Sequence, residues 1–97
     1  MNLFVGIDVS SKKLDICFLD SDDTRLKEET LHNDINGAKQ VKDSILAYRQ
    51  QFHYEKIVIG MESTSVYSFH PAILLDNDED LQRIGVEVVV QNHKAIH

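Results

Sequence analysis

The hydrophobic pattern of this chain changes period partway along, and this change limits the folds that the chain can adopt. The first third shows apolar and polar residues in alternation, which indicates half-buried β-strands. Between Ile35 and Phe52 the apolar residues recur at helical spacing, which predicts an amphipathic helix with Asp34 as its N-cap. Two short runs rich in β-branched residues, Lys56–Met61 and Val86–Val90, predict two further strands.

The expected order of elements is β-β-β-α-β-α-β. A third strand over Thr24–Leu31 carries many charges, which favours a position at the edge of a sheet. The first three strands can pair antiparallel, whereas the later strands follow helical crossovers and so must be parallel. We expect a second helix between Ser65 and Leu75, and an acidic loop or short extra turn at Asp76–Asp80. The predicted fold is a mixed sheet in an α/β domain, with Lys56–Met61 buried on both faces.

The 97 residues provide enough chain for one domain, residues 1–97. Since the chain ends soon after the last predicted strand, we expect it to be the amino-terminal fragment of a longer protein, cut before its final helices. Cys17 has no cysteine partner, and neither a secretion signal nor a long apolar run is evident. These features predict a cytoplasmic protein that does not associate with a membrane.

The charge balance is acidic. Sixteen acidic residues against ten basic residues give a formal net charge of −6. A domain that holds nucleic acid by charge is expected to be basic, so this chain alone should bind nucleic acid weakly.

The segments Val5–Asp8 and Ile59–Glu62 share one pattern: each is an apolar strand that ends in a carboxylate, with a glycine two positions earlier. Because side chains alternate along a strand, each glycine lies on the same face as its acid. If the two strands are parallel neighbours, Asp8 and Glu62 emerge at the same carboxyl-terminal edge, where open α/β sheets bind ligands. The glycines leave space for a cation or a backbone to approach.

The hairpin predicted for the first two strands adds a third acid, Asp15, to the candidates. Pairing Val9 with Leu14 matches the polarity of both faces and sets Asp8 opposite Asp15. Like charges directly opposed are destabilising unless a cation or a proton lies between them. A turn one residue longer or shorter would separate them, and we interpret Asp15 as a solvated acid at an edge.

Carboxylates in this arrangement suit a magnesium ion, which prefers oxygen ligands and also takes substrate phosphate. A pair of such ions can stabilise the attacking and leaving oxygens of a phosphodiester displacement. Two carboxylates are too few to hold two ions, so the remaining ligands would lie beyond His97. The alternative for Asp8 and Glu62 is structural, because an acid at a strand end is often a cap or a salt-bridge partner.

Three segments together resemble the amino-terminal domain of DEDD-type transposases, the insertion-sequence 110 family and its Piv-type invertase relatives. They are Gly6–Ser10 followed by Lys13–Asp15, then Met61–Tyr67, and then Val88–Asn92. The glycine-isoleucine-aspartate start alone is weakly specific, and its combination with the glutamate-threonine-tyrosine block makes the resemblance fairly specific. Many members have glycine where this chain has Ser65.

The resemblance implies a RuvC-like fold within the ribonuclease H superfamily, with Asp8 and Glu62 as the first two metal-binding, catalytic acids. It implies a DNA recombinase that uses Mg²⁺ or Mn²⁺, acts on DNA, is in some members guided by RNA, and assembles as a homo-oligomer. The last two acids and a carboxyl-terminal domain with a catalytic serine would be missing, so we expect the fragment alone to be inactive.

Two other hypotheses remain open. The amino-terminal lobe of an actin-like ATPase or a sugar kinase has a similar strand-aspartate-turn-strand start, although its phosphate-binding loop usually offers a glycine that Ser10–Lys13 lacks. A non-catalytic assembly module is also compatible with the short acidic chain. Stabilisation by nucleotide would favour the kinase-like hypothesis, and the absence of any divalent-metal effect would favour the assembly module.

Overall fold

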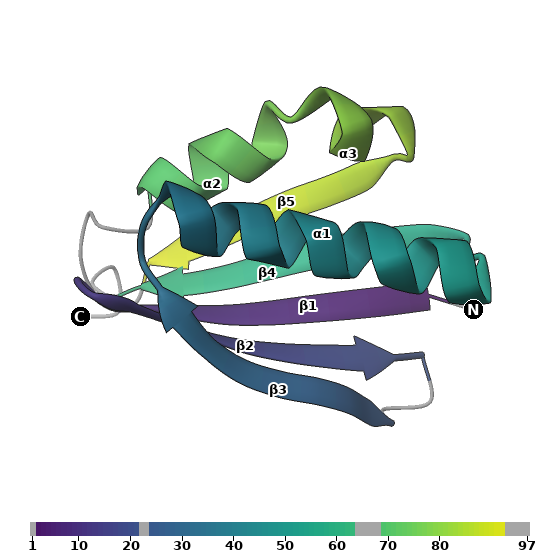
Figure 1. Ribbon diagram of the computed structural model, residues 1–97, viewed down its shortest axis with the longest axis horizontal. Coiled ribbons are helices and arrows are strands. Elements are labelled where there is room, and N and C mark those ends of the chain that lie inside the picture. The colour runs from purple at the N-terminus through teal and green to yellow at the C-terminus, as the bar shows by residue number, and fades with distance from the viewer. Residues whose placement is uncertain (1, 22–23, 64–68, 93–97) are drawn as a thin grey trace.

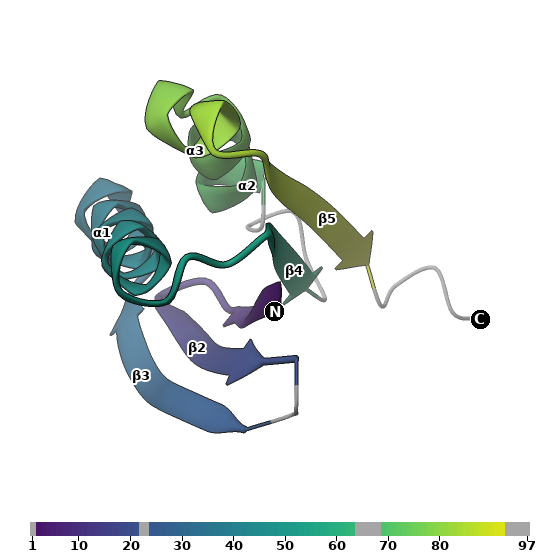
Figure 2. The ribbon, with the colours of Figure 1, turned by 90° about the vertical axis from the view of Figure 1, so that its right-hand side faces the viewer.

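The computed structural model shows a five-stranded mixed sheet with helices packed on one of its faces (Figures 1 and 2). The structure describes residues 2–21, 24–63 and 69–92. Its elements are β1 (Asn2–Val9), β2 (Lys13–Asp20), β3 (Arg25–His32), α1 (Ile35–Phe52), β4 (Lys56–Ser63), α2 (Phe69–Asp76), α3 (Glu79–Arg83) and β5 (Val86–Asn92).

The strands lie in the order β3-β2-β1-β4-β5. The pairs β1–β2 and β2–β3 are antiparallel, whereas β1–β4 and β4–β5 are parallel. This arrangement confirms the predicted mixed sheet and the edge position of the charged third strand. The carboxyl ends of β1, β4 and β5 meet at one edge of the sheet, on the left in Figure 1.

The hydrophobic core lies between the sheet and the helices. On β4, Ile57, Ile59 and Met61 point into it and are buried, as their β-branched and apolar character predicts. The prediction that this strand is buried on both faces is wrong, because Val58 and Gly60 are only half-buried. The helices of the described chain all cover the same face (Figure 2), which leaves the opposite face, here called the open face, uncovered by them.

Helix α1 begins and ends at the residues that the sequence predicts. The Asp34 carboxylate accepts a hydrogen bond from the Gly37 amide at 2.8 Å, which confirms the predicted N-cap. The helix ends at His53 in the left-handed conformation (φ 52°), whose amide donates to the Arg49 carbonyl oxygen at 2.8 Å. A Cβ at Gly37 would collide with the carbonyl oxygen of His32, so the start of α1 packs against β3 too closely for any side chain.

The second helical region agrees with its prediction over the residues that the structure describes. Helix α2 starts at Phe69, and the earlier part of the predicted Ser65–Leu75 helix lies outside the described residues. The acidic segment contributes a further short helix, α3, because Asp78 acts as an N-cap and accepts hydrogen bonds from the amides of Asp80 and Leu81 at 3.0 and 3.1 Å.

An ion pair joins α1 to this cap. Lys42 Nζ lies 2.8 Å from Asp78 Oδ2 and 3.0 Å from Asp80 Oδ2. Its hydrogen bonds to Asp78 and Asp80 raise the pKa of Lys42. Burial pushes the pKa of Asp78 upward, but the hydrogen bonds from Lys42 and from the α3 amides outweigh it and leave that pKa below its usual value. None of the helices in the described residues is long and apolar enough to cross a membrane.

Candidate functional site

Asp8 and Glu62 lie opposite each other on neighbouring parallel strands. The Cα register of β1 and β4 pairs Asp8 with Glu62 and, two residues earlier, Gly6 with Gly60. Adjacent strands are separated by about 4.8 Å, and residues in register on parallel strands point to the same face. Both acids are exposed on the open face, so the placement expected from the two matching segments is confirmed.

The two glycines stand beside these acids without a structural need for glycine. A Cβ at Gly60 would meet no described atom within 4 Å, and a Cβ at Gly6 would only touch the Cys17 carbonyl oxygen at 4.0 Å. Neither glycine has the positive φ that favours this residue, in contrast to Gly85. Within the described residues, the lack of side chains at these two positions leaves the sheet surface open next to Asp8 and Glu62.

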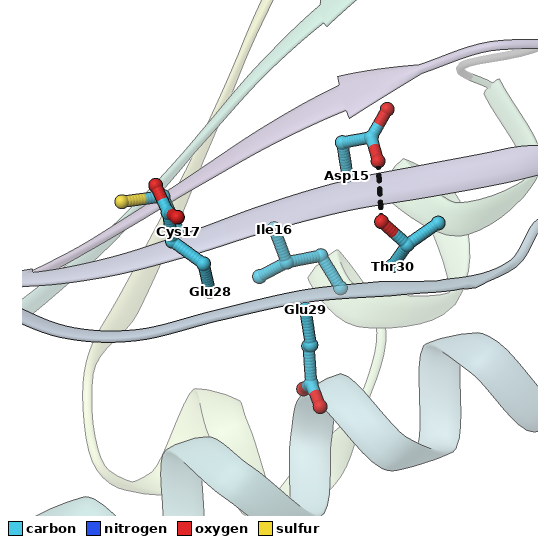
Figure 3. A pocket seen from close by; sticks show the side chains of 6 residues that line it. All are labelled: Asp15, Ile16, Cys17, Glu28, Glu29 and Thr30. Atoms are coloured by element: carbon cyan, nitrogen blue, oxygen red, sulfur yellow. Dashed lines mark hydrogen bonds between the residues drawn. The ribbon is translucent and has the colours of Figure 1, made fainter.

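Asp15 lies on the open face as well. The antiparallel register of β1 and β2 pairs Asp8 with Asp15, as the sequence predicts. The Asp15 carboxylate accepts a hydrogen bond from Thr30 Oγ1 at 2.7 Å, which directs it toward β3 (Figure 3). Over the described ranges, no group of three histidine, cysteine or acidic side chains gathers closely enough to hold a metal ion. Asp15 therefore does not complete a three-ligand site with Asp8 and Glu62 in this structure.

A shallow hollow of about 470 Å³ is lined by Gly6, Gly60, Asp8 and Glu62. Val89 and Gln91 of β5 also line it, and Gln91 is paired in register with Glu62. The sequence pattern does not mark either residue as part of a site. Their alternation with Val88 and Val90 places them on one face of β5, but only the register with β4 shows that this is the face of the acids.

A second hollow, of about 510 Å³, lies over β2 and β3 (Figure 3). Its three acidic residues do not converge, because Glu29 points toward the helical side. Glu28 lies on the same face as Asp15, but it forms an ion pair with Arg25 at 2.8 Å. Glu29 also forms an ion pair with Lys27 at 3.2 Å. This hollow therefore contains no constellation for catalysis.

The donor chemistry of Asp8 and Glu62 fits a hard divalent cation. Both supply carboxylate oxygens, both are open to solvent, and the surface beside them is not filled by other described side chains. A cation near this pair would also offset the repulsion between acids that lie in register. The residues can thus provide part of a magnesium or manganese coordination shell.

The turn that follows Asp8 uses its polar groups internally. Ser10 Oγ lies 3.2 Å from both the amide nitrogen and the carbonyl oxygen of Lys13, and the Ser10 amide donates to the same carbonyl at 3.0 Å. Asn33 donates from its side chain to the Ser10 carbonyl at 2.8 Å and from its amide to the Lys12 carbonyl at 3.0 Å. A phosphate-binding loop needs outward amides, and the Lys13 amide is already engaged here.

Residues 5–97 match the family model of DEDD-type transposases of the insertion-sequence 110 group, whose description is "Transposase". The match covers nearly the whole chain. No curated protein matches the chain.

Solved structures share the fold at low sequence identity. Thermus thermophilus RuvC in complex with a Holliday junction has a TM-score of 0.54 and 11% identity, over 96% of this chain and 66% of RuvC. A Bacteroides thetaiotaomicron protein with an actin-like ATPase fold has a TM-score of 0.55 and 11% identity, over 92% of this chain and 32% of that protein. A Streptomyces griseus glucokinase has a TM-score of 0.51 and 21% identity, over 93% of this chain and 33% of the kinase.

These likenesses concern the fold alone, and the chain spans about two thirds of the length of RuvC and about a third of the length of the other two proteins. The mixed sheet and its RuvC-like neighbours confirm the expected ribonuclease H-like fold.

Proposed function

The chain belongs to the DEDD transposase family, and from this premise we propose that it is the part of a DNA transposase in which Asp8 and Glu62 bind catalytic divalent metal ions. The proposed substrate is DNA, and the proposed chemistry is cleavage and exchange of DNA strands. A guide RNA and assembly into a homo-oligomer remain predictions from the resemblance.

One observation carries the proposal: Asp8 and Glu62 are in register on the open face, beside two glycines that the described structure does not need. Acids that serve only as caps or salt-bridge partners would not call for an open surface next to them. A site that admits a metal ion and the sugar-phosphate backbone of DNA does call for it. The glycines thus favour the metal-site hypothesis over the structural one.

The bound ions would supply electrostatic stabilisation of the charge that develops on phosphodiester oxygens. The task of Asp8 and Glu62 is to hold negative charge at fixed positions on two adjacent strands, which is more rigid than a placement on loops. Gly6 and Gly60 keep the surface low enough for a backbone to approach.

The two acids do not make a complete site. Two metal ions need more carboxylate ligands than Asp8 and Glu62 offer, so we propose that further acids come from a longer protein of which this chain is the amino-terminal part. The net charge of −6 also supports a longer protein, because the positive surface that DNA binding requires would then lie in its other parts.

A kinase-like or ATPase-like function has less support, although two such structures share the fold. The turn at Ser10–Lys13 has no glycine, and its Ser10 side chain is bonded within the turn. A non-catalytic assembly module does not account for the open surface at Gly6 and Gly60.

The test is magnesium-dependent DNA cleavage by the transposase that contains this domain. Asp8→Asn and Glu62→Gln preserve shape but remove charge. Mutation of a residue that only hydrogen-bonds to a metal ligand already lowers metal affinity or activity by about 10- to 100-fold. Removal of the charge of a ligand itself should therefore lower the cleavage rate by at least about 100-fold.

The matched control is Asp43→Asn, an exposed acid on α1, on the helical side of the sheet, which should leave the rate unchanged. Cleavage that persists in both Asp8→Asn and Glu62→Gln would refute the proposed roles. Loss of cleavage in all three variants would also contradict them, because it would reflect a general effect of removing acidic charge.

A further inference from the structure

The two edges of the sheet differ in how they are protected. The β3 edge carries Arg25, Lys27, Glu28 and Glu29, and such charges discourage pairing with another strand. The β5 edge reads Val86–Asn92 and contains one charged residue, Glu87, among four valines. Val89 and Val90 are 43% and 44% exposed. A strand of this composition at an edge, with no described strand on its outer side, is a template for pairing.

The sequence of β5 is complementary to itself in one antiparallel register. When the two-fold axis passes through Val89, all seven residues of β5 are paired. Glu87 then lies opposite Gln91 of the second copy, so that a carboxylate faces an amide and no like charges are opposed. Val88 lies opposite Val90, and Val89 lies opposite its own copy. Paired residues also share a face, as antiparallel pairing requires.

We propose that two copies of this chain associate through β5, antiparallel and centred on Val89, to form one continuous ten-stranded sheet. The contact is isologous and uses both β5 edges, while the charged β3 edges remain outside. It therefore closes at a dimer and does not continue as a fibre. This inference does not depend on the proposed function.

The pairing has a consequence for the candidate site. Gln91 is in register with Glu62 and lines the hollow over the acids. In the dimer, Glu87 of the second copy lies directly opposite Gln91, so each copy places a carboxylate next to the hollow of the other. Both open faces lie on the same side of the joined sheet.

The first test is sedimentation equilibrium of this chain over a range of concentrations. Because the contact is one strand pair and is smaller than a standard interface, we expect a weak, concentration-dependent monomer–dimer equilibrium. Val89→Lys places two positive charges against each other at the axis and should abolish the dimer. Phe4→Lys is the matched control, since Phe4 is similarly exposed, at 41%, on the open face but on the central strand β1. This control should dimerise like the unmodified chain.

The second test fixes the register. In a Cys17→Ser background, Val89→Cys should form a disulfide-linked dimer on mild oxidation, whereas Val88→Cys alone should not, since its partner is Val90. Circular dichroism checks that each variant is folded. The proposal is overturned if the chain is monomeric at every concentration, if it forms larger assemblies, or if Val89→Lys dimerises as well as Phe4→Lys. Equal cross-linking of the Val88→Cys and Val89→Cys variants would also overturn it.

Discussion

Asp8 and Glu62 are paired in register across the parallel strands β1 and β4, at the edge where the carboxyl ends of the strands meet. Two exposed acids in register on adjacent strands repel each other, and a divalent cation bound between them would offset this repulsion.

Removal of either charge should leave the metal-free chain equally stable or more stable. We expect Asp8→Asn and Glu62→Gln to change the free energy of unfolding by between zero and about 1 kcal/mol in the stabilising direction, because like charges directly opposed on neighbouring strands are destabilising. Urea denaturation in the presence of a chelator measures this change. With excess magnesium the unmodified chain should gain stability and the variants should not. Clear destabilisation of both variants in chelator would instead identify the acids as structural caps.

The glycines should divide into two classes. Gly6→Ala and Gly60→Ala should stabilise the chain by about 0.5–1 kcal/mol, because a Cβ meets open space and alanine loses less backbone entropy than glycine in a strand. Gly37→Ala should destabilise it by about 1–3 kcal/mol, because the added Cβ collides with the His32 carbonyl. Thermal unfolding of the three variants checks both directions. A loss of stability in Gly60→Ala equal to that in Gly37→Ala would contradict the view that the surface beside Glu62 is open.

The ion pair between Lys42 and Asp78 should stabilise the fold over a defined range of pH. Because folding lowers the pKa of Asp78, the ionised carboxylate stabilises the fold at pH values above its unfolded pKa of 3.8. This stabilisation is lost as the pH falls through the pKa of the folded state. Because folding raises the pKa of Lys42, the charged ammonium group stabilises the fold at pH values below its unfolded pKa of 10.5. This stabilisation is lost as the pH rises through the pKa of the folded state.

Lys42→Met should therefore be less stable than the unmodified chain at neutral pH, and the difference should shrink in strong acid and in strong alkali. Denaturation at a series of pH values tests this. A difference that stays constant into strong acid would show that Lys42 acts by packing and not by charge.

The chain alone should not cut or join DNA. It supplies two of the acids that we propose for the site, and its net charge of −6 opposes DNA binding. Incubation with supercoiled DNA and magnesium or manganese should leave the DNA intact. Metal-dependent nicking that survives purification and disappears in Asp8→Ala would show that the chain's own acids are sufficient.

The sequence predicts the positions of Asp8 and Glu62 well, because the alternation of side chains along a strand and the rule for parallel crossovers together fix both face and edge. It does not predict that β4 has one uncovered face. A run of β-branched residues such as Val58 and Ile59 indicates a strand but does not reveal how many faces are covered by helices. Gln91 escapes prediction for a related reason, since its alignment with Glu62 depends on the register between β4 and β5.

For the acidic segment the sequence leaves a loop and a short extra turn open, and helix α3 shows that the extra turn forms. The cause is local, because Asp78 caps the amides of Asp80 and Leu81. Its ion pair with Lys42, which comes from a distant part of the sequence, holds that cap against α1. A long-range partner of this kind is not visible in the local pattern.

Asp8 and Glu62 should together bind one divalent ion, and Mn²⁺-induced broadening of amide NMR signals in this chain locates the bound ion residue by residue. The acidic segment Asp76–Asp80 provides an internal competitor, because it carries more acids but no open glycine surface. We predict that the signals at Asp8 and Glu62 broaden first, and that Asp8→Asn or Glu62→Gln removes this effect while Asp43→Asn does not. Broadening that is strongest at Asp76–Asp80 and unchanged in Asp8→Asn and Glu62→Gln would contradict the account.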